Sequence, residues 1–487
     1  MKILFAASEM YPLIKTGGLA DVAGALPVAL RNKGHDVKLI MPAYRGILEK
    51  VAPIQKSINL GNPFGVGDLL LLETHIPEND TPIWLLQCQA LYEREDGPYV
   101  DKHGIDFTDN HIRFAALSWA TATLALHGDL MDWQADILHL NDWQTGFAAA
   151  YLKGWKTEHL PIVTTVHNLR YNGSFEMDKF VDTHLSPELL SIHGMEFYGR
   201  FSGLKAGLVY ADAITTVSPT YAQEILTPEY GDGLDGTLRA IQEKLSGILN
   251  GVDYDQWSPE KDTLIPHNYD VESLDQKQAN KLALLQENGL SEDTSKPIFG
   301  VVSRLTEQKG LDLVLEVMPA LLDKGARLVV LGSGDKHLES GYLALQKTYP
   351  EQVAVRIGYF EDYSHRIQAG IDALLIPSRF EPCGLTQLYA LKYGTLPVVR
   401  HTGGLADTVF EDEVLEDAVP GNEKRANGFV FKEANAESLK SAMERCMECF
   451  NDTEKWQEKQ KNAMRYDYSW DVVTDQWINL YQSLLNK

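Results

Sequence analysis

The sequence has few cysteines and no long apolar run. Four cysteines in 487 residues are too few for a disulfide framework, which fits a reducing compartment. No apolar stretch approaches the roughly 18 residues that a membrane-spanning helix needs. Near the N-terminus the run Ile3 to Ala7 is shorter than the core of a secretion signal, and Glu9 ends it. We therefore expect a cytoplasmic protein with no export signal and no membrane partner.

Positive charge is also scarce. Lysine and arginine together number 44 against 68 aspartates and glutamates, which gives a formal net charge of −24. A surface this acidic repels polyphosphate backbones, so we expect no nucleic-acid partner. An anionic substrate must instead be met by a few cations placed close to it.

The motifs of several common cofactors are incomplete. The loops Lys15-Thr16-Gly17-Gly18 and Gly332-Ser333-Gly334-Asp335 both lack the third glycine of G-x-G-x-x-G, and the first also lacks the G-K-[ST] ending of a P-loop. Nicotinamide cofactors and ATP hydrolysis are therefore disfavoured. The single C-x-x-C, Cys446 to Cys449, has no second cysteine pair, so we expect no zinc site.

What the chain does contain is a strand-helix-strand pattern that occurs twice. A length of 487 residues exceeds what one hydrophobic core usually serves, so two domains are expected. A turn-rich stretch near Asn250 separates them, which predicts domains over 1–248 and 249–465 and a final helical segment over 466–487. The pattern consists of strand Lys2–Ser8, helix Leu19–Lys33 and strand Asp36–Met41, then strand Ile298–Val302, helix Leu311–Lys324 and strand Arg327–Leu331. This alternation predicts an α/β protein with two doubly wound, Rossmann-like parallel sheets.

The first strand leads into a glycine-rich loop with a cation. Lys15, Gly17 and Gly18 stand directly before a helix, where free N–H groups favour a phosphate, although such loops are often only turns. The segment Thr16 to Asp21 has the same sequence as Thr402 to Asp407. We therefore expect a Gly-Gly helix N-terminus in each domain.

Other strands of the first domain end in polar residues. Asp142 follows the strand Asp136–Leu140, and His167 with Asn168 follows the strand Pro161–Val166. Carboxyl ends of parallel strands share one edge of a sheet, which is where ligands bind. Each group alone could be a capped turn, and His139 is expected to be a structural histidine.

In the second domain two cations share one strand-to-helix loop. Arg304 and Lys309 together suggest a diphosphate, since arginine offers a planar fork and lysine a point charge; two solvated surface cations are the alternative.

A second loop of this domain carries a carboxylate. Glu381 follows a buried strand and precedes Cys383 and a helix N-terminus near Gly384, Leu385 and Thr386. A carboxylate beside free amides is suited to the hydroxyl groups of a sugar, while a capped turn with a solvated glutamate remains the plain alternative.

With these motifs in order, the chain resembles the bacterial, ADP-glucose-dependent members of the glycogen/starch synthase family from end to end. The resemblance implies the GT-B architecture, in which two Rossmann-like domains face a cleft and a C-terminal helix returns to the first domain. It also implies retaining transfer of glucose from ADP-glucose to the non-reducing end of an α-1,4-glucan such as glycogen or a malto-oligosaccharide, without a cofactor or a metal. Asn141 stands where some members of the family carry histidine.

The resemblance also implies roles for individual residues. Arg304 and Lys309 stabilise the departing diphosphate, Glu381 holds the glucose hydroxyls, and His167 and Asp142 flank the reacting carbon. Residues expected to bind substrate are Lys15, Gly17, Gly18, Asn168, Asn250, Tyr359, Cys383, Gly384, Leu385 and Thr386, of which Lys15 meets the phosphates and Tyr359 stacks on the adenine.

Two other functions stay open at this stage. One is a related nucleotide-sugar glucosyltransferase that acts on a small acceptor. The other is a glucan-binding protein without activity, because a fold alone never proves catalysis. A phosphorylase would need a lysine that holds pyridoxal phosphate, and no motif identifies one.

Overall fold

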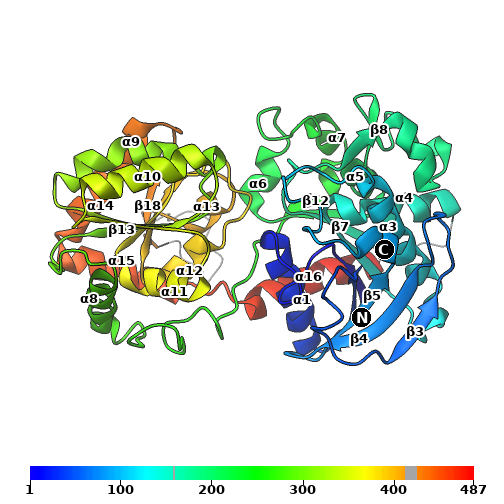
Figure 1. The fold of residues 1–487 in the computed structure, drawn as a ribbon, viewed down its shortest axis with the longest axis horizontal. Helices are drawn as coiled ribbons and strands as arrows, with labels where there is room; N and C mark the ends of the chain where they lie inside the picture. The colour runs from blue at the N-terminus through cyan, green and yellow to red at the C-terminus, as the bar shows by residue number, and fades with distance from the viewer. Residues whose placement is uncertain (157–159, 412–424, 487) are drawn as a thin grey trace. The chain divides into compact units, whose positions relative to one another are not determined.

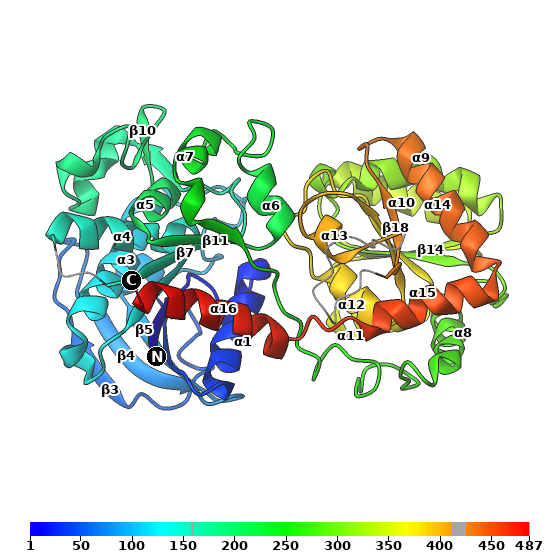
Figure 2. The same cartoon turned by 180° about the vertical axis from the view of Figure 1, so that it is seen from behind.

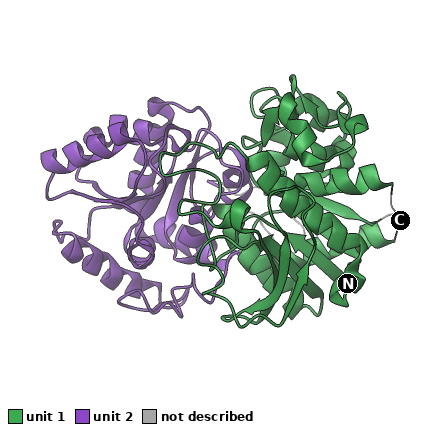
Figure 3. Cartoon of the chain, turned by 45° about the vertical axis from the view of Figure 1, so that its right-hand side comes forward, with its two compact units in different colours: residues 1–251, 470–487 green, residues 252–469 purple. Residues whose placement is uncertain are grey.

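The structure is a computed structural model that describes residues 1–156, 160–411 and 425–486. The chain divides into two compact units, which Figure 3 colours separately: one contains residues 1–251 and 470–487, and the other contains residues 252–469. Within the described ranges, no helix combines the length and the apolar character needed to cross a bilayer.

The first unit is built on a nine-stranded sheet. Its central strands pair in parallel, and only the edge formed by β5, β4 and β3 is antiparallel. The strand order is β12 (Leu245–Gly247), β11 (Ala213–Thr216), β7 (Ile162–Val166), β6 (Ile137–Asn141), β1 (Lys2–Ala6), β2 (Asp36–Pro42), β5 (Thr81–Gln87), β4 (Leu70–Ile76) and β3 (Lys56–Asn59).

The middle of this sheet is buried on both faces. Every residue of β6 and β7 is buried, and in β1 only Lys2 is exposed. Strands covered on both faces are expected to be continuous apolar runs rather than alternating ones, which is the pattern of Ile3-Leu4-Phe5. The register pairs Ile3 with both Val37 and Ile137, so β1 lies between β2 and β6.

Helices and a small antiparallel sheet complete the first unit (Figures 1 and 2). The helices are α1 (Gly18–Asn32), α2 (Gln89–Tyr92), α3 (Asn110–Leu126), η1 (Gly128–Met131), α4 (Asp142–Trp155), η2 (Met177–Thr183), η3 (Pro187–Leu189), α5 (Gly203–Tyr210), α6 (Pro219–Glu224), α7 (Asp235–Ala240), η4 (Gln242–Lys244) and α16 (Trp470–Leu485). The small sheet has the order β8 (Ser174–Glu176), β10 (Arg200–Ser202), β9 (Glu196–Phe197).

The C-terminal helix α16 belongs to the first unit, as the resemblance implied, and lies beside α1 (Figures 1 and 2). Its apolar face is buried, and the Tyr481 hydroxyl is 2.7 Å from Nδ1 of His139 on β6. The other ring nitrogen of His139 is 2.7 Å from Oγ1 of Thr165 on β7. Both nitrogens are therefore used inside the core, which confirms the structural role expected for His139.

The second unit has a six-stranded sheet in which every pair is parallel. Side chains on β13 alternate between two apolar clusters: Phe299 and Val301 face one, and Ile298 and Val302 face the other. Both faces are therefore covered. The strand order is β15 (Val353–Ile357), β14 (Arg327–Gly332), β13 (Ile298–Val302), β16 (Ala373–Ile376), β17 (Leu396–Arg400) and β18 (Phe429–Phe431).

The helices of the second unit cover both faces of its sheet. Helices α9, α10 and α14 supply side chains to one apolar cluster, and α8 and α11 to the other. Their bounds are η5 (Leu274–Gln276), α8 (Lys277–Glu287), η6 (Glu307–Lys309), α9 (Leu311–Leu322), α10 (Lys336–Thr348), α11 (Glu361–Gly370), α12 (Thr386–Lys392), α13 (Gly403–Thr408), α14 (Ala436–Phe450) and α15 (Thr453–Arg465).

Each sheet has one point where the strand order reverses. In the first unit it lies between β1 and β6, and in the second between β13 and β16. Loops that leave such strands diverge to opposite faces and open a crevice at the carboxyl edge. These two edges are where a ligand site is expected.

Candidate active site

Three neighbouring strands deliver polar residues to the crevice of the first unit. β1 leads to Glu9 and Lys15, β6 ends at Asn141 before Asp142, and β7 leads to His167. Because β7, β6 and β1 are adjacent and parallel, these side chains share one edge. The sequence predicted this gathering for Asp142 and His167.

Asp142 is held in an unusual backbone conformation. Its φ of 54° lies in the left-handed region, which costs a non-glycine residue energy and is concentrated at functional sites. Its carboxylate accepts the backbone N–H of His167 at 2.8 Å. Burial raises the pKa of Asp142 to about 7, and the nearby charge of Glu9 adds to the shift. The carboxyl group thus changes charge near neutral pH.

His167 is oriented by Asn141. The Asn141 amide nitrogen donates to the Ala6 carbonyl at 2.9 Å, so its oxygen is the atom that faces Nε2 of His167, also at 2.9 Å. Nε2 therefore carries the ring proton, and Nδ1 keeps its lone pair. Burial lowers the pKa of His167 to about 3, which keeps the imidazole neutral. The next residue, Asn168, accepts the N–H of Arg170 through its side chain.

The glycine-rich loop lies open in front of α1. The Lys15 ammonium is 2.7 Å from Asp21, and both side chains are partly exposed. A Cβ added at Gly18 would meet no atom within 4 Å. The first N–H groups of α1 have no intrahelical acceptor, so this helix start has room for an anion.

In the second unit Lys309 and Glu381 form an ion pair. The Lys309 ammonium is 2.5 Å from the Glu381 carboxylate, which also accepts the Ser378 hydroxyl at 3.0 Å. Glu381 is only 6% exposed, so the pair is largely removed from water. The two loops that flank the reversal between β13 and β16 thus meet through their charged side chains.

Arg379 braces the same two loops. Its guanidinium donates to both oxygens of Asp312 at 2.7 Å, and its backbone N–H donates to the Gln308 carbonyl at 2.8 Å. These contacts fix the spacing of Lys309 and Glu381. Arg304, which precedes this bracing, is exposed, and within the described ranges its side chain forms no ion pair.

The residues after Glu381 form a tight turn into α12. Cys383 is buried, and Gly384 has φ of 75°, a conformation that favours glycine. The Gln387 amide donates to the carbonyls of Cys383 and Gly384 at 3.0 Å each, which holds the turn closed. Leu385 is the N-cap and Thr386 the first helical residue, as the sequence suggested.

The second Gly-Gly segment also begins a helix, as expected, but its surroundings differ from those of the first. A Cβ at Gly403 would come within 2.0 Å of the Glu381 carbonyl, and one at Gly404 within 2.1 Å of the Cys383 carbonyl. These glycines are needed for close packing against the Glu381 loop. The repeated sequence therefore forms an open loop at Gly17 and Gly18, whereas at Gly403 and Gly404 it is packed against the Glu381 loop.

The last two predicted binding residues lie after edge or near-edge strands. Tyr359 follows β15 and is 63% exposed, so its ring offers a surface for stacking. Asn250 follows β12 in the first unit and is buried.

Sequence reasoning missed three residues that shape these loops: Glu9, Asp21 and Arg379. Each carries a charge within or beside a motif that was recognised. Glu9 acts on a neighbouring backbone, Asp21 on the Lys15 side chain, and Arg379 on Asp312 in a distant loop, and none of these contacts leaves a spacing signal in the sequence.

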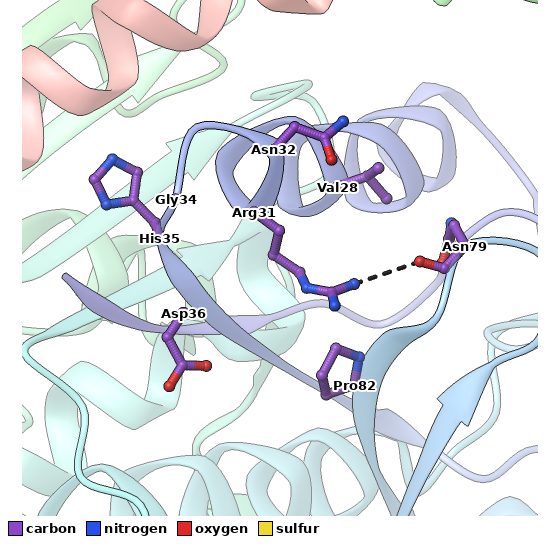
Figure 4. Close-up of a pocket in the computed structure, with 8 residues that line it drawn as sticks. All are labelled: Val28, Arg31, Asn32, Gly34, His35, Asp36, Asn79 and Pro82. Carbon is purple, nitrogen blue, oxygen red and sulfur yellow. Dashed lines mark hydrogen bonds between the residues drawn. The ribbon is translucent and has the colours of Figure 1, made fainter.

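Another hollow lies away from both crevices. Figure 4 shows a pocket between the end of α1 and the starts of β2 and β5, where Arg31 donates to the Asn79 carbonyl. None of the predicted site residues lines it; the lining residues are Val28, Arg31, Asn32, Gly34, His35, Asp36, Asn79 and Pro82. Among the described residues there is no cluster of three or more histidine, cysteine, aspartate or glutamate side chains with metal-binding geometry.

Two family models match the chain. Residues 2–240 match the starch synthase catalytic domain, and residues 285–463 match the glycosyl transferases group 1. The two matches fall in the first and second units respectively.

Solved structures share this architecture. The catalytic domain of starch synthase IV from Arabidopsis thaliana, bound to ADP and acarbose, superposes with a TM-score of 0.86 at 31% identity and covers 100% of this chain and 99% of its own. A sucrose-phosphate synthase from Thermosynechococcus elongatus, at a TM-score of 0.60 and 16% identity, shares the fold alone. The chain thus has the GT-B fold of two α/β domains with a returning C-terminal helix.

Several proteins of similar sequence are glycogen synthases. A glycogen synthase from Marinomonas sp. strain MWYL1 is 84% identical over 486 residues, with 100% of both chains covered. Glycogen synthases from Yersinia pestis strain Pestoides F and Paramagnetospirillum magneticum are 47% and 45% identical, with at least 98% of each chain covered. The chain therefore belongs to the bacterial glycogen synthase family.

Proposed function

We propose that the protein transfers glucose from ADP-glucose to the non-reducing end of an α-1,4-glucan, with retention at the anomeric carbon and release of ADP. The bond between C1 of glucose and the diphosphate oxygen breaks, and C1 bonds to O4 of the acceptor, whose hydroxyl proton passes to the leaving diphosphate oxygen. The electron pair of the broken bond leaves with ADP. The starch synthase neighbour is bound to ADP and acarbose, which supports an adenine nucleotide donor and a glucan acceptor for this chain.

The Lys309–Glu381 pair carries the proposal. Breaking a glycosyl–phosphate bond builds negative charge on the leaving diphosphate, so a cation already in place lowers the barrier. Lys309 supplies that cation, and Arg304 adds a forked donor from the same loop. Glu381 lies 2.5 Å from Lys309 and is suited to accept hydrogen bonds from glucose hydroxyls. The side chain that would bind the phosphate is therefore in direct contact with the one that would bind the sugar.

Binding of ADP-glucose also changes the partners of Lys309 and Glu381. In the structure Glu381 neutralises Lys309. A bound diphosphate takes over the ammonium, and the carboxylate turns to the glucose hydroxyls. Cys383, Gly384, Leu385 and Thr386 border the sugar at the start of α12, and Tyr359 stacks on the adenine.

Residues of the first unit act on the reacting carbon and the acceptor. Positive charge develops on glucose as the bond breaks, and an ionised Asp142 stabilises it. The neutral His167 offers the Nδ1 lone pair to a sugar hydroxyl. Lys15, Gly17 and Gly18 meet the phosphates, and Asn168 and Asn250 bind substrate nearby.

The direct test is a donor panel. ADP-, UDP- and GDP-glucose are each incubated with glycogen, and radiolabel in ethanol-insoluble glucan is counted. We expect label from ADP-glucose above all, without added metal and unchanged by EDTA. Label only in a small soluble acceptor, or glycogen co-sedimentation without nucleotide turnover, would replace the proposal with one of the two alternatives. We further propose that the enzyme works in the cytoplasm.

A further inference from the structure

A buried carboxylate lies behind the glycine-rich loop. Glu9 follows β1 and is only 3% exposed. It accepts the Thr16 backbone N–H at 2.5 Å and the Thr16 hydroxyl at 2.6 Å, and the N–H of Gly17 as well. Burial raises the pKa of this carboxyl group, and the three hydrogen bonds partly offset that shift.

These bonds decide which amides remain for a ligand. Thr16 and Gly17 stand directly before α1, and their N–H groups point back to Glu9 rather than outward. The amides of Gly18 and Leu19, in the first turn, have no intrahelical acceptor. The space beside Gly18 is open. Glu9 thus fixes the loop so that the open amides and Lys15 lie together at the start of the helix.

We propose that Glu9 is a positioning residue that holds the Lys15–Gly18 segment in the shape that receives the donor's diphosphate. This inference rests on the proposed function, because the diphosphate is that of ADP-glucose. It does not place Glu9 in contact with substrate. The carboxylate acts through the backbone of Thr16 and Gly17.

Loss of the Glu9 charge and loss of its hydrogen bonds to the loop should change donor binding in opposite directions. A negative charge near a diphosphate repels it, so the charge effect alone predicts tighter donor binding in Glu9→Gln. The geometric effect predicts weaker binding, because the variant's amide keeps only one acceptor oxygen, and its NH2 group meets an N–H of the loop where the second acceptor is needed. The sign of the change therefore separates the two.

The experiment compares Glu9→Gln with Glu73→Gln in the full chain. Glu73 is a partly buried carboxylate of the same unit that bonds to Lys38 and Trp84 on the sheet, so it controls for loss of a buried charge. We expect the Kd for ADP and the KM for ADP-glucose to rise about tenfold in Glu9→Gln, as for loss of one charge-assisted hydrogen bond. The KM for glycogen should stay unchanged, and Glu73→Gln should leave all three constants as in the wild type.

Coupling to Lys15 completes the test. If Glu9 acts through the loop, the double variant with Lys15→Ala should bind ADP little worse than Lys15→Ala alone. Hydrogen exchange should also be faster at residues 16 and 17 in ligand-free Glu9→Gln. Unchanged or tighter ADP binding, or additive effects with Lys15→Ala, would overturn the role of Glu9. A wild-type protein that forms no glucan would instead overturn the proposed function, and the exchange measurement would still decide whether Glu9 holds the loop.

Discussion

At the scale of single residues, two cations of the proposed site are each paired with a carboxylate. Lys309 is matched by Glu381, and Lys15 by Asp21, at 2.5 and 2.7 Å. The partly exposed Lys15–Asp21 pair contributes little net stability, whereas loss of either partner of the largely buried Lys309–Glu381 pair would leave the other charge poorly solvated. Each cation is then released to a phosphate only by an anion that binds better than its resident carboxylate.

Removal of one cation should slow the chemistry strongly. We expect Lys309→Ala and Arg304→Ala each to lower kcat by about 10²–10³, comparable to the loss of one transition-state donor. Lys324→Ala removes a lysine that pairs with Glu444 on the surface of the same unit and serves as the control. Initial rates at saturating ADP-glucose and glycogen provide the measurement, and wild-type turnover in either site variant would contradict the assignment.

The pKa of Asp142 gives a pH dependence whose sign can be worked out. The folded-state pKa is about 7 against an ordinary value of 3.8, so the folded protein holds the proton more tightly between these values. Stability from this group is therefore fully present below the lower value and declines as pH rises towards about 7.

Asp142→Asn tests that sign, because asparagine does not titrate. The melting temperature of the variant relative to the wild type should rise from about pH 5 to about pH 8. Its kcat should fall about 10²-fold, since ionised Asp142 is expected to stabilise the developing positive charge. A difference in melting temperature that does not change with pH would refute a raised pKa.

At the scale of elements, two helix starts with the same sequence have different surroundings. At Gly18, before the body of α1, the space is open, whereas at Gly404 in α13 an added Cβ would come within 2.1 Å of the Cys383 carbonyl. The same sequence, Thr-Gly-Gly-Leu-Ala-Asp, thus leaves room for a ligand at the start of α1 and allows close packing at the start of α13.

A pair of alanine substitutions separates these roles. Gly404→Ala must displace the loop of Glu381 and should lower both the melting temperature and kcat. Gly18→Ala should leave the melting temperature unchanged or slightly higher, because alanine favours helix, while the KM for ADP-glucose rises. Thermal melts and donor titrations measure both. A large loss of stability in Gly18→Ala would count against an open helix start.

The elements themselves could be predicted well from the sequence, and the site only in outline. Buried parallel strands such as β13 are short apolar runs, and amphipathic helices such as α9 follow them. The sequence pattern of each element therefore matches its position in the folded unit. Strands β3, β8, β9 and β10 are only two to four residues long, too short to show a pattern, and they were missed together with β4. The bracing of Arg379 against Asp312 joins positions 67 residues apart, which no local pattern encodes.

At the scale of the whole molecule, the two units differ in how the chain completes them. The second unit is one continuous segment, 252–469, but the first needs both ends of the chain. Residues 470–487 close the face of the first unit beside α1, where Trp477 and Tyr481 are buried against His139. The first unit is therefore incomplete without the last helix.

Tyr481→Phe should weaken this closure in a defined way. The variant keeps the ring but loses the hydroxyl partner of His139, which should cost about 1 kcal/mol or more because a buried nitrogen is left unpaired. Hydrogen exchange should quicken in β6 and β7 and stay unchanged in β13 to β16. A chain that ends at residue 469 should lose the protection of the first unit far more widely. Equal changes in both units would argue against a local role.

The position of α16 bears on how the protein is made. During translation, residues 1–251 emerge from the ribosome before residues 470–487 are synthesised. The nascent first unit therefore has an uncovered apolar face while the whole second unit is synthesised. Translation that stalls or terminates early anywhere in the second unit therefore yields a chain with that face still bare. The first unit can therefore bury this face only after residues 470–487 have been synthesised.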